Sequence, residues 1–245
     1  MGSESKYYIG TSGWTYEGWR GDFYPMDLAR SRWFEYYAQH FNAVEINATF
    51  YRSFKIETYQ KWRSKAPPEF RYAIKAPRVI THRKMLVNTA QDILEFSTCA
   101  QQLGETLGMM LLQLAPHMAL DFQRLRTALQ SFHDPSQVAV EFRHSRWEVA
   151  ETFELLQELG AAYVCADSPK YKLKDRITGK KGYIRLHGRR IWYADNYSES
   201  ELCEFAKLAH GMISQGAEAV YIFFNNDIGG FAHRNALKLK EIICR

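Results

Sequence analysis

The chain has 245 residues, of which 46% are hydrophobic and 15% aromatic, and its formal net charge is +5. This length fits one large domain such as an α/β barrel, and the apolar content is enough for a sizeable core. The charge is mildly basic and contains no long run of like charges, so it does not by itself indicate a nucleic-acid-binding protein.

The cysteines and the first residues point to a cytoplasmic protein. Four cysteines, Cys99, Cys165, Cys203 and Cys244, are widely spaced and form no C-x-x-C pair, which argues against a zinc cluster or a disulfide framework. No segment approaches the roughly 18 uninterrupted apolar residues of a membrane helix, and no apolar signal segment opens the chain. We therefore predict a cytoplasmic protein with no membrane partner, in which residues 1–6 are disordered or derived from an expression tag.

Eight strand-like segments follow one another along the chain, each alternating or continuously apolar. They span residues 7–11, 43–47, 71–75, 109–114, 138–142, 162–166, 183–187 and 220–225. Stretches with helical spacing lie between them, for example around Trp33 and Tyr37, and the connections are too long for hairpins. The series predicts an α/β fold, a (β/α)8 TIM-type barrel forming a single domain over residues 1–245. Because no Gly-x-Gly-x-x-Gly motif follows the first strand, we expect no dinucleotide, and we predict no cofactor.

Polar or charged residues end most of these strands and share a face with more buried positions. If Val44 and Ile46 face the helices, then Glu45 faces the barrel axis, because successive side chains of a strand alternate. The same rule points a larger set inward: Lys75, Gln113, Glu141, Arg143, Cys165, Asp167, Arg185, His187 and Asn225. Packing alone rarely needs so many ionisable groups, so we predict a functional site at the C-terminal mouth of the barrel.

Six ordered motifs cover nearly the whole chain. They are YIGTSGWTY from Tyr8, FNAVEINATFYR from Phe41, YAIKAPRVITH from Tyr72, VAVEFRH from Val138, YIRLHGR from Tyr183 and FFNND from Phe223. Together these motifs resemble the DUF72 family, also called the YecE-like or UPF0759 family. The resemblance implies a TIM-type barrel, but it supplies neither a function nor a set of catalytic residues.

The acidic strand ends are the candidate catalytic groups. Glu45, Glu141 and Asp167 lie on the second, fifth and sixth predicted strands, near the mouth where barrel enzymes place their chemistry. We predict that these carboxylates act as acid or base and that His187 acts as a proton shuttle, because its imidazole titrates near neutrality.

The same acids and His187 also have the chemistry to hold a divalent cation. Three inward bases, Lys75, Arg143 and Arg185, compete with that interpretation, because buried charges that are paired with each other need no metal. We favour a metal-free site in which these bases orient an anionic substrate, and a metal-dependent phosphoesterase remains an alternative.

The loops after the predicted strands add candidate anion-binding groups. Arg189 follows the seventh strand, while Asn225 ends the eighth, and Gly229 and Gly230 come after it and precede the last helix. In many barrels this location binds phosphate through backbone N–H groups, and arginine adds bidentate contacts. Arg78, which a preceding proline projects from the end of the third strand, joins this set.

Aromatic residues near the same loops form a predicted lid over the mouth: Trp14, Tyr51, Trp147 and Tyr193. Such rings either stack on a sugar or simply cover the barrel. Together with two carboxylates they make a glycosidase-like hydrolase another alternative.

The leading interpretation is an enzyme that binds a small anionic substrate, phosphorylated or nucleotide-like, and performs hydrolysis by acid/base chemistry. No redox motif is present, which favours hydrolysis over redox chemistry. A nucleic-acid-binding protein is the alternative from another class, because the segment 170–181 is rich in lysine and aromatic residues are available for stacking. The sequence leaves the oligomeric state open.

Overall fold

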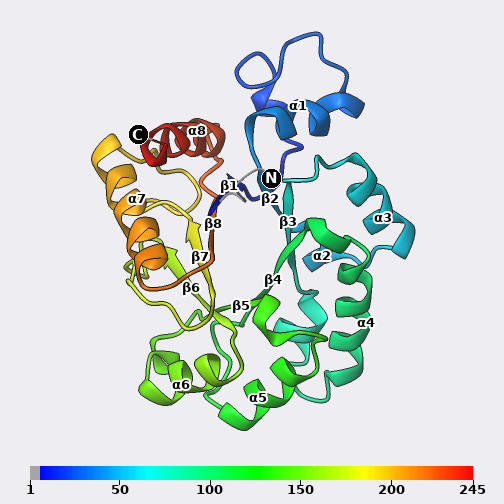
Figure 1. The fold of residues 1–245 in the computed structure, drawn as a ribbon, viewed down its shortest axis with the longest axis vertical. Helices are drawn as coiled ribbons and strands as arrows, with labels where there is room; N and C mark the ends of the chain where they lie inside the picture. Colours follow the sequence, from blue (N-terminus) through cyan, green and yellow to red (C-terminus); the bar gives the residue numbers. More distant parts are fainter. Residues whose placement is uncertain (1–5, 245) are drawn as a thin grey trace.

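The computed structural model describes residues 6–244, and eight parallel strands form its centre. They are β1 (Tyr7–Thr11), β2 (Ala43–Ile46), β3 (Arg71–Lys75), β4 (Leu107–Gln113), β5 (Val138–Glu141), β6 (Ala162–Asp167), β7 (Lys181–Leu186) and β8 (Ala219–Phe224). Each strand pairs with its sequence neighbour, except that β1 pairs with β8 and not with β2. The helices surround these strands (Figure 1), which confirms the predicted (β/α)8 TIM-type barrel.

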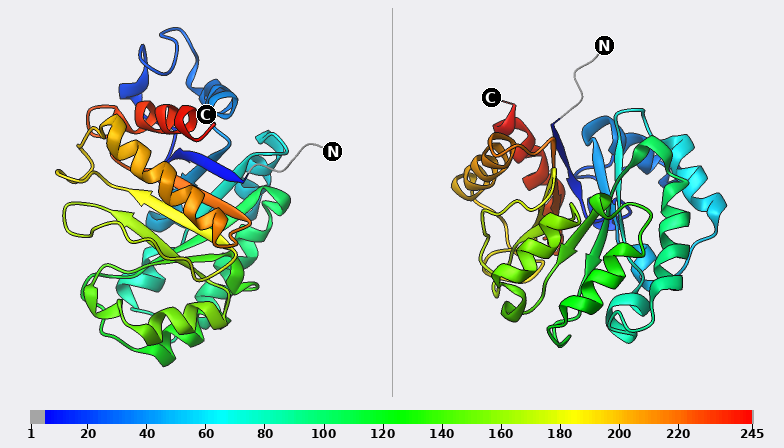
Figure 2. Two further views of the ribbon diagram at one scale, coloured as in Figure 1. Left: turned by 60° about the vertical axis from the view of Figure 1, so that its left-hand side comes forward. Right: turned by 60° about the horizontal axis from the view of Figure 1, so that its bottom comes forward.

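The helices occupy the connections between the strands. They are α1 (Trp33–His40), α2 (Ala48–Tyr51), α3 (Ile56–Lys65), α4 (Ala90–Gln101), α5 (Phe122–Gln130), α6 (Ala150–Glu158), α7 (Glu199–Ser214) and α8 (Phe231–Ile243). Short helices are η1 (Glu17–Trp19), η2 (Arg30–Arg32), η3 (Val79–Arg83), η4 (Gly104–Thr106), η5 (Pro135–Gln137) and η6 (Ser145–Trp147). The helices α7 and α8 pack side by side and cover β8 and β1 (Figure 2). Among the described residues, no helix combines the length and apolar character needed to cross a membrane.

One of the eight β/α units lacks its helix. Residues 168–180, which connect β6 to β7, contain no helix in the structure. The segment instead runs beside β6, where Thr178 Oγ1 accepts a hydrogen bond from Tyr163 N–H at 2.8 Å and donates one to Ala161 O at 2.7 Å. Leu173 and Ile177 pack against the outer core from this segment. An extended connection with two apolar anchors therefore replaces the missing helix.

Two apolar clusters follow the alternation of the strands. The cluster inside the barrel contains Tyr8, Ala43, Ala73, Met109, Leu111, Ala139, Ala162, Val164, Tyr183, Tyr221 and Phe223. The larger cluster, between strands and helices, contains Val44 and Ile46, as predicted for β2. The prediction for β6 is wrong, because Cys165 belongs to the outer cluster and Val164 to the inner one. Asp167 shares the parity of Cys165 and therefore points away from the barrel axis.

Side chains close the seam between β1 and β2, where the structure shows no strand pairing in its described part. The Asn42 side chain donates from Nδ2 to Tyr7 O at 2.8 Å and accepts at Oδ1 from Ile9 N–H at 2.9 Å. One amide side chain thus takes the place of two backbone partners of β1.

Tyr37, from helix α1, completes the seam. Its hydroxyl accepts a hydrogen bond from Thr11 N–H at 2.9 Å and lies 3.0 Å from Ala43 O, to which it donates. Thr11, Tyr37 and Ala43 are all fully buried. A single phenol therefore satisfies two buried backbone groups on the two strands that do not pair.

The prediction for residues 1–6 falls mostly on residues 1–5, which lie outside the described residues. Lys6 is described, and its carbonyl accepts a hydrogen bond from Val220 N–H at 2.8 Å. Lys6 therefore contacts β8 one residue before β1 begins.

Replacing Tyr37 with phenylalanine should destabilise the barrel by about 1–3 kcal/mol, because Thr11 N–H and Ala43 O would stay buried without their partner. The measurement is the free energy of unfolding in urea. Tyr36 is on the same helix, and its hydroxyl makes no hydrogen bond with residues 6–244. Tyr36→Phe should therefore change the free energy of unfolding by less than about 0.5 kcal/mol. Equal losses in the two variants would contradict the role given to Tyr37.

Candidate functional site

The guanidinium of Arg185 lies at the centre of the barrel mouth, between two carboxylates. Arg185, on β7, is 1% exposed, and both Glu45, on β2, and Glu141, on β5, are fully buried. Arg185 Nη2 lies 2.6 Å from Glu45 Oε1 and Nε lies 2.9 Å from Glu45 Oε2, a bidentate contact, while Nη1 contacts Glu141 Oε2. The three strands are not neighbours in the sheet, so these side chains meet because all three project toward the barrel axis.

Glu45 is held by hydrogen bonds from both sides of the seam. Ser12 Oγ and Asn47 Nδ2 donate to Oε1 at 2.8 and 3.1 Å, and the Tyr183 hydroxyl donates to Oε2 at 2.8 Å. Burial alone would raise the pKa of this carboxyl, but the Arg185 charge and the hydrogen bonds from Arg185 and Ser12 hold the pKa below its usual value. Glu45 is therefore an ionised counterion.

Glu141 connects Arg185 to a second cation. Arg143 Nε lies 2.5 Å from Glu141 Oε1, and His187 Nε2 lies 3.4 Å from the same oxygen. Burial opposes ionisation of Glu141, yet Arg143 and Arg185 hold its pKa well below the usual range. We call these five residues, Glu45, Glu141, Arg143, Arg185 and His187, the Arg185 cluster.

His187 is the neutral member of the Arg185 cluster. It is completely buried, with Arg143 Nη2 at 3.2 Å from Nε2 and Asn225 Nδ2 at 3.1 Å from Nδ1. Burial and then the charge of Arg185 lower the pKa of His187 to about 4. The imidazole is therefore uncharged at neutral pH, so the predicted proton shuttle does not titrate near neutrality.

A pocket of about 390 Å³ lies above the Arg185 cluster, and we call it the mouth pocket. It is lined by Ser12, Tyr16, Asn47, Tyr51, Lys75, Gln113, Arg143, Arg185, Tyr193 and Asn225. Among these lining residues three are cationic and none is acidic, because Glu45 and Glu141 are covered from the pocket by their partners. The mouth pocket therefore presents positive charge and amide and hydroxyl groups to a ligand.

Lys75 is the cation of the mouth pocket that lacks a direct acidic partner. Its Nζ donates to Gln113 Oε1 at 2.8 Å and lies 4.3 Å from the centre of the Phe50 ring, and no carboxylate of the described residues is within 4.0 Å. Burial and then the charge of Arg185 lower the pKa of Lys75 to about 7, although Glu141 acts in the opposite sense. A large fraction of Lys75 is thus a free amine at neutral pH.

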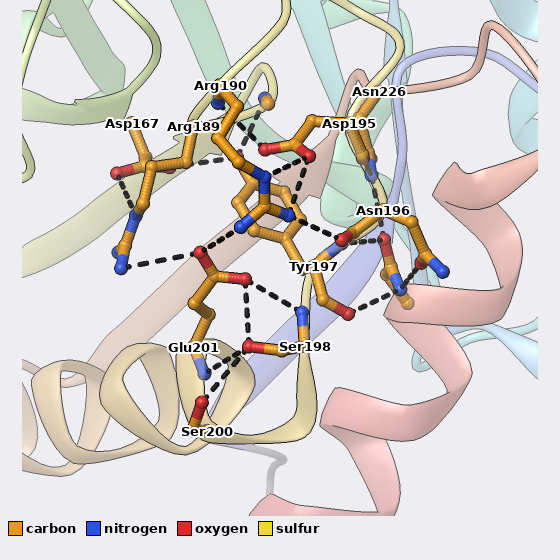
Figure 3. A network of polar contacts seen from close by, with 12 residues as sticks. Asp167, Arg189, Arg190, Asp195, Asn196, Tyr197, Ser198, Ser200, Glu201 and Asn226 are labelled. Carbon is orange, nitrogen blue, oxygen red and sulfur yellow. Dashed lines mark hydrogen bonds and ion pairs between the residues drawn. The ribbon is translucent and has the colours of Figure 1, made fainter.

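Asp167 belongs to a different network, which Figure 3 shows beside helix α7. Its Oδ2 accepts a hydrogen bond from the Tyr197 hydroxyl at 3.0 Å, and its Oδ1 lies 3.4 Å from Arg189 Nε. Arg189 also pairs with Glu204 at 2.9 Å. The predicted inward position of Asp167 is therefore wrong, and Arg189 is neutralised by acids rather than directed into the mouth pocket.

Of the other loop residues predicted to bind an anion, one lines the mouth pocket and three do not. Asn225 lines the mouth pocket. Gly229 and Gly230 have φ angles of +94° and +72° and form the turn before α8, in which Gly230 N–H donates to Asp227 O at 2.8 Å. Arg78 is exposed at the start of η3 and does not line the mouth pocket.

The predicted aromatic lid is only partly formed. Tyr51 and Tyr193 line the mouth pocket, and Trp14 lines an adjoining, more apolar pocket of about 430 Å³ that also contacts Tyr51. Trp147 is 1% exposed and stacks on Phe142 with ring centres 5.1 Å apart, so it belongs to the core between strands and helices and is not part of a lid.

Sequence reasoning missed two tyrosines of the site. Tyr183 shares the parity of Arg185 on β7, and that signal was sufficient to place it inside the barrel. Tyr16 reaches the mouth pocket from the loop after β1, where its hydroxyl donates to Ser12 O at 2.5 Å. No periodic pattern in the loop identifies that contact.

In the described part of the chain, no three His, Cys, Asp or Glu side chains gather in a way that could hold a metal ion. The carboxylates of the Arg185 cluster direct their oxygens at guanidinium groups instead. This arrangement gives no support to the metal-dependent alternative.

The fold and the site define a class of protein: a (β/α)8 barrel with buried ion pairs at its C-terminal mouth. Residues 8–244 match the family model described as protein of unknown function DUF72, and the chain belongs to this family, as its motifs predicted. It is 24% identical to the UPF0759 protein YunF of Bacillus subtilis, over 96% of this chain and 94% of that protein. It is 31% identical to the UPF0759 protein YecE of Escherichia coli, over 57% of this chain and 49% of that protein.

Solved structures show the same fold. A DUF72 family protein from Thermotoga maritima is 30% identical, with a TM-score of 0.86 over 98% of this chain and 100% of that one. A DUF72 family protein from Enterococcus faecalis is 20% identical, with a TM-score of 0.84 over 98% of this chain and 96% of that one.

Arg185→Met should lower the free energy of unfolding by about 3–5 kcal/mol, because it leaves two buried carboxylates without their shared counterion. Adding Glu45→Gln and Glu141→Gln should restore part of the loss, since the uncompensated charges are then removed. Arg234→Met, which breaks an exposed ion pair with Asp22, is the control and should cost at most about 1 kcal/mol. No recovery in the triple variant would argue against charge compensation.

His187→Gln should flatten the dependence of stability on pH. The pKa of His187 is about 4 in the folded protein and 6.5 ordinarily, so the unfolded chain binds more protons between these values. The contribution of the neutral His187 to the free energy of unfolding is therefore complete above about pH 6.5 and is lost as pH falls toward 4.

The stability difference between the wild type and His187→Gln should therefore shrink from about pH 7.5 to about pH 5, as measured by urea unfolding. His133→Gln is the matched control for removing an exposed histidine. A difference that stays constant with pH would contradict a buried neutral His187.

Proposed function

We propose that this protein is an enzyme that binds a small anionic substrate in the mouth pocket and uses Lys75 for acid/base chemistry. The observation that carries the proposal is the arrangement of charge by depth: three cations line the mouth pocket while two ionised carboxylates lie beneath them. With Lys75 protonated, this leaves one positive charge uncompensated among these five groups. One phosphate or carboxylate group of a substrate matches that charge.

Arg143 has a free donor for such a group. Its Nε contacts Glu141, and its Nη2 lies 3.2 Å from His187 Nε2 and 3.5 Å from Gln113 Oε1. Nη1 makes no hydrogen bond with the described residues, and the side chain lines the mouth pocket. The contacts of Nε and Nη2 fix the guanidinium plane, so a bound anion meets a pre-oriented donor.

The acid/base role falls to Lys75 because its amine reaches the mouth pocket and has a pKa of about 7. Such a group exchanges protons efficiently at neutral pH, with a water molecule as hydrolysis requires or with the substrate itself. Glu45 and Glu141 are assigned to positioning, because they are ionised and covered by Arg185 and Arg143. The proposal thus keeps the acid/base hydrolysis expected from the sequence and changes the residue that performs it.

The size of the mouth pocket, about 390 Å³, suits a small phosphorylated or carboxylated molecule. No observation favours a nucleic acid, because the basic segment between β6 and β7 contacts its own chain: Lys174 pairs with Glu148, and Arg176 stacks 3.9 Å from the Phe153 ring centre. A glycosidase needs carboxylates that reach the sugar. Glu45 and Glu141 are covered by Arg185 and Arg143, so the site does not favour that alternative. We also propose a cytoplasmic location, because the four cysteines are free thiols.

Anion binding provides the test of this function. Inorganic phosphate and a small carboxylate, titrated by calorimetry, should bind the wild type, and Arg143→Met should weaken the affinity at least about tenfold by removing a charge-assisted hydrogen bond. Binding should also weaken as pH rises through about 7, because Lys75 loses its charge. Arg78→Met, outside the mouth pocket, should bind like the wild type. Absence of binding to the wild type, or wild-type affinity in Arg143→Met, would refute the anion site.

A further inference from the structure

We infer that Lys75 is a covalent nucleophile that forms an imine with a small aldehyde or ketone carrying a neighbouring carboxylate or phosphate. The inference rests on the proposed anion site and names its substrate class, and it gives Lys75 a covalent step in place of proton transfer to water.

The surroundings of Lys75 differ from those of the surface lysines. Lys84 and Lys180 are exposed and form ion pairs with acids at 2.6 and 2.9 Å. Lys75 is 9% exposed at the end of β3, and its Nζ contacts the Gln113 amide oxygen and the face of Phe50. An amine with one neutral acceptor and an aromatic face is not fixed as an ammonium ion by a salt bridge.

The charged groups around Lys75 favour the free amine that a nucleophile requires. Arg185 and Arg143 face it from β7 and the end of β5, and both lower the pKa of its ammonium group. Glu141 and Glu45 act in the opposite sense, but each is already committed to a guanidinium. His82, from η3, is also near, and its own pKa is lowered to about 4, so it adds no charge at neutral pH.

Gln113 places the amine beside the anion site. Its Oε1 accepts from Lys75 Nζ at 2.8 Å and lies 3.5 Å from Arg143 Nη2 and 3.4 Å from Arg185 Nη1. A carbonyl carbon bonded to Lys75 therefore lies close to the donors of Arg143. The anionic group must then stand one or a few bonds from the carbonyl, as in a 2-oxo acid or a short aldehyde phosphate.

The chemical step balances without another reactant. The neutral amine of Lys75 attacks the carbonyl carbon, the C–N bond forms, and a proton moves from nitrogen to the carbonyl oxygen to give a carbinolamine. The nitrogen lone pair then expels the hydroxyl group, which leaves as water with a second proton from nitrogen. The products are an imine and one water molecule. The bound carboxylate or phosphate compensates the positive charge when the imine is protonated.

Reductive trapping of the full-length protein tests the inference. Glyoxylate, pyruvate or glyceraldehyde 3-phosphate is added with sodium cyanoborohydride, which reduces an imine to a stable secondary amine, and peptides are mapped by mass spectrometry. Lys75 should be labelled at least about tenfold faster than any surface lysine near pH 7, because ordinary lysines are almost fully protonated there. Labelling of Lys75 should rise with pH and level off above about 7.

Two variants separate Lys75 from the rest of the chain. Lys75→Arg keeps a cation but cannot form the imine, so the specific label should disappear. Lys84→Arg replaces an exposed lysine paired with Asp92 and should leave that label unchanged. Acetaldehyde, which has no anionic group, should label Lys75 much more slowly than glyoxylate.

The outcomes distinguish this inference from the proposed function. If phosphate binds and depends on Arg143, but the label spreads over surface lysines and omits Lys75, the imine inference fails while the anion site stands. If no anion binds, and glyoxylate and acetaldehyde label Lys75 at the same rate, the anion site fails and the substrate class falls with it, whereas the nucleophilic amine remains. Rapid anion-dependent labelling of Lys75 supports both.

Discussion

The structure depends on burying one guanidinium, that of Arg185, on the axis of a barrel. Removing a charged group from water costs several kcal/mol, and only close, well-oriented counterions offset that cost. Glu45 and Glu141 supply them from β2 and β5. Glu45 also needs donors besides Arg185, and this explains why Ser12 and Tyr183 project toward the same point. The polar upper half of the barrel is thus one electrostatic unit above an apolar lower half.

The depth of each charge decides what the mouth pocket can do. Carboxylates held beneath their counterions cannot readily take or give protons, because ionisation is favoured by each of their contacts. The groups that remain for chemistry are those with incomplete partners, namely Arg143 Nη1 and Lys75 Nζ. A site of this kind binds and polarises a substrate with cations. It differs from the predicted mouth, in which Glu45, Glu141 and Asp167 were the acids or bases that act on the substrate.

The alternation of strand residues predicted much of this site. Glu45, Glu141 and Arg185 each lie between apolar residues that face the helices, so their inward position could be read from the sequence. The rule failed on β6, where Val164 and Cys165 are both apolar and the polar end of the strand was the only guide. The positions of Trp147 and Arg189 were not predictable. Both follow the end of a strand in connections without a regular hydrophobic period, and their contacts with Phe142 and Glu204 form only when the chain is folded.

The seam between β1 and β2 gives the barrel a built-in line of weakness. A ladder of backbone hydrogen bonds opens cooperatively, whereas a few side-chain hydrogen bonds can break one at a time. We therefore expect amide hydrogen exchange to be faster in β1 and β2 than in the other strands of the barrel. The mouth pocket spans this line, since Ser12 stands on one side and Asn47 on the other. A ligand that contacts both Ser12 and Asn47 would link β1 to β2 across the seam and stabilise the barrel there. A bound ligand should therefore slow amide hydrogen exchange along both β1 and β2.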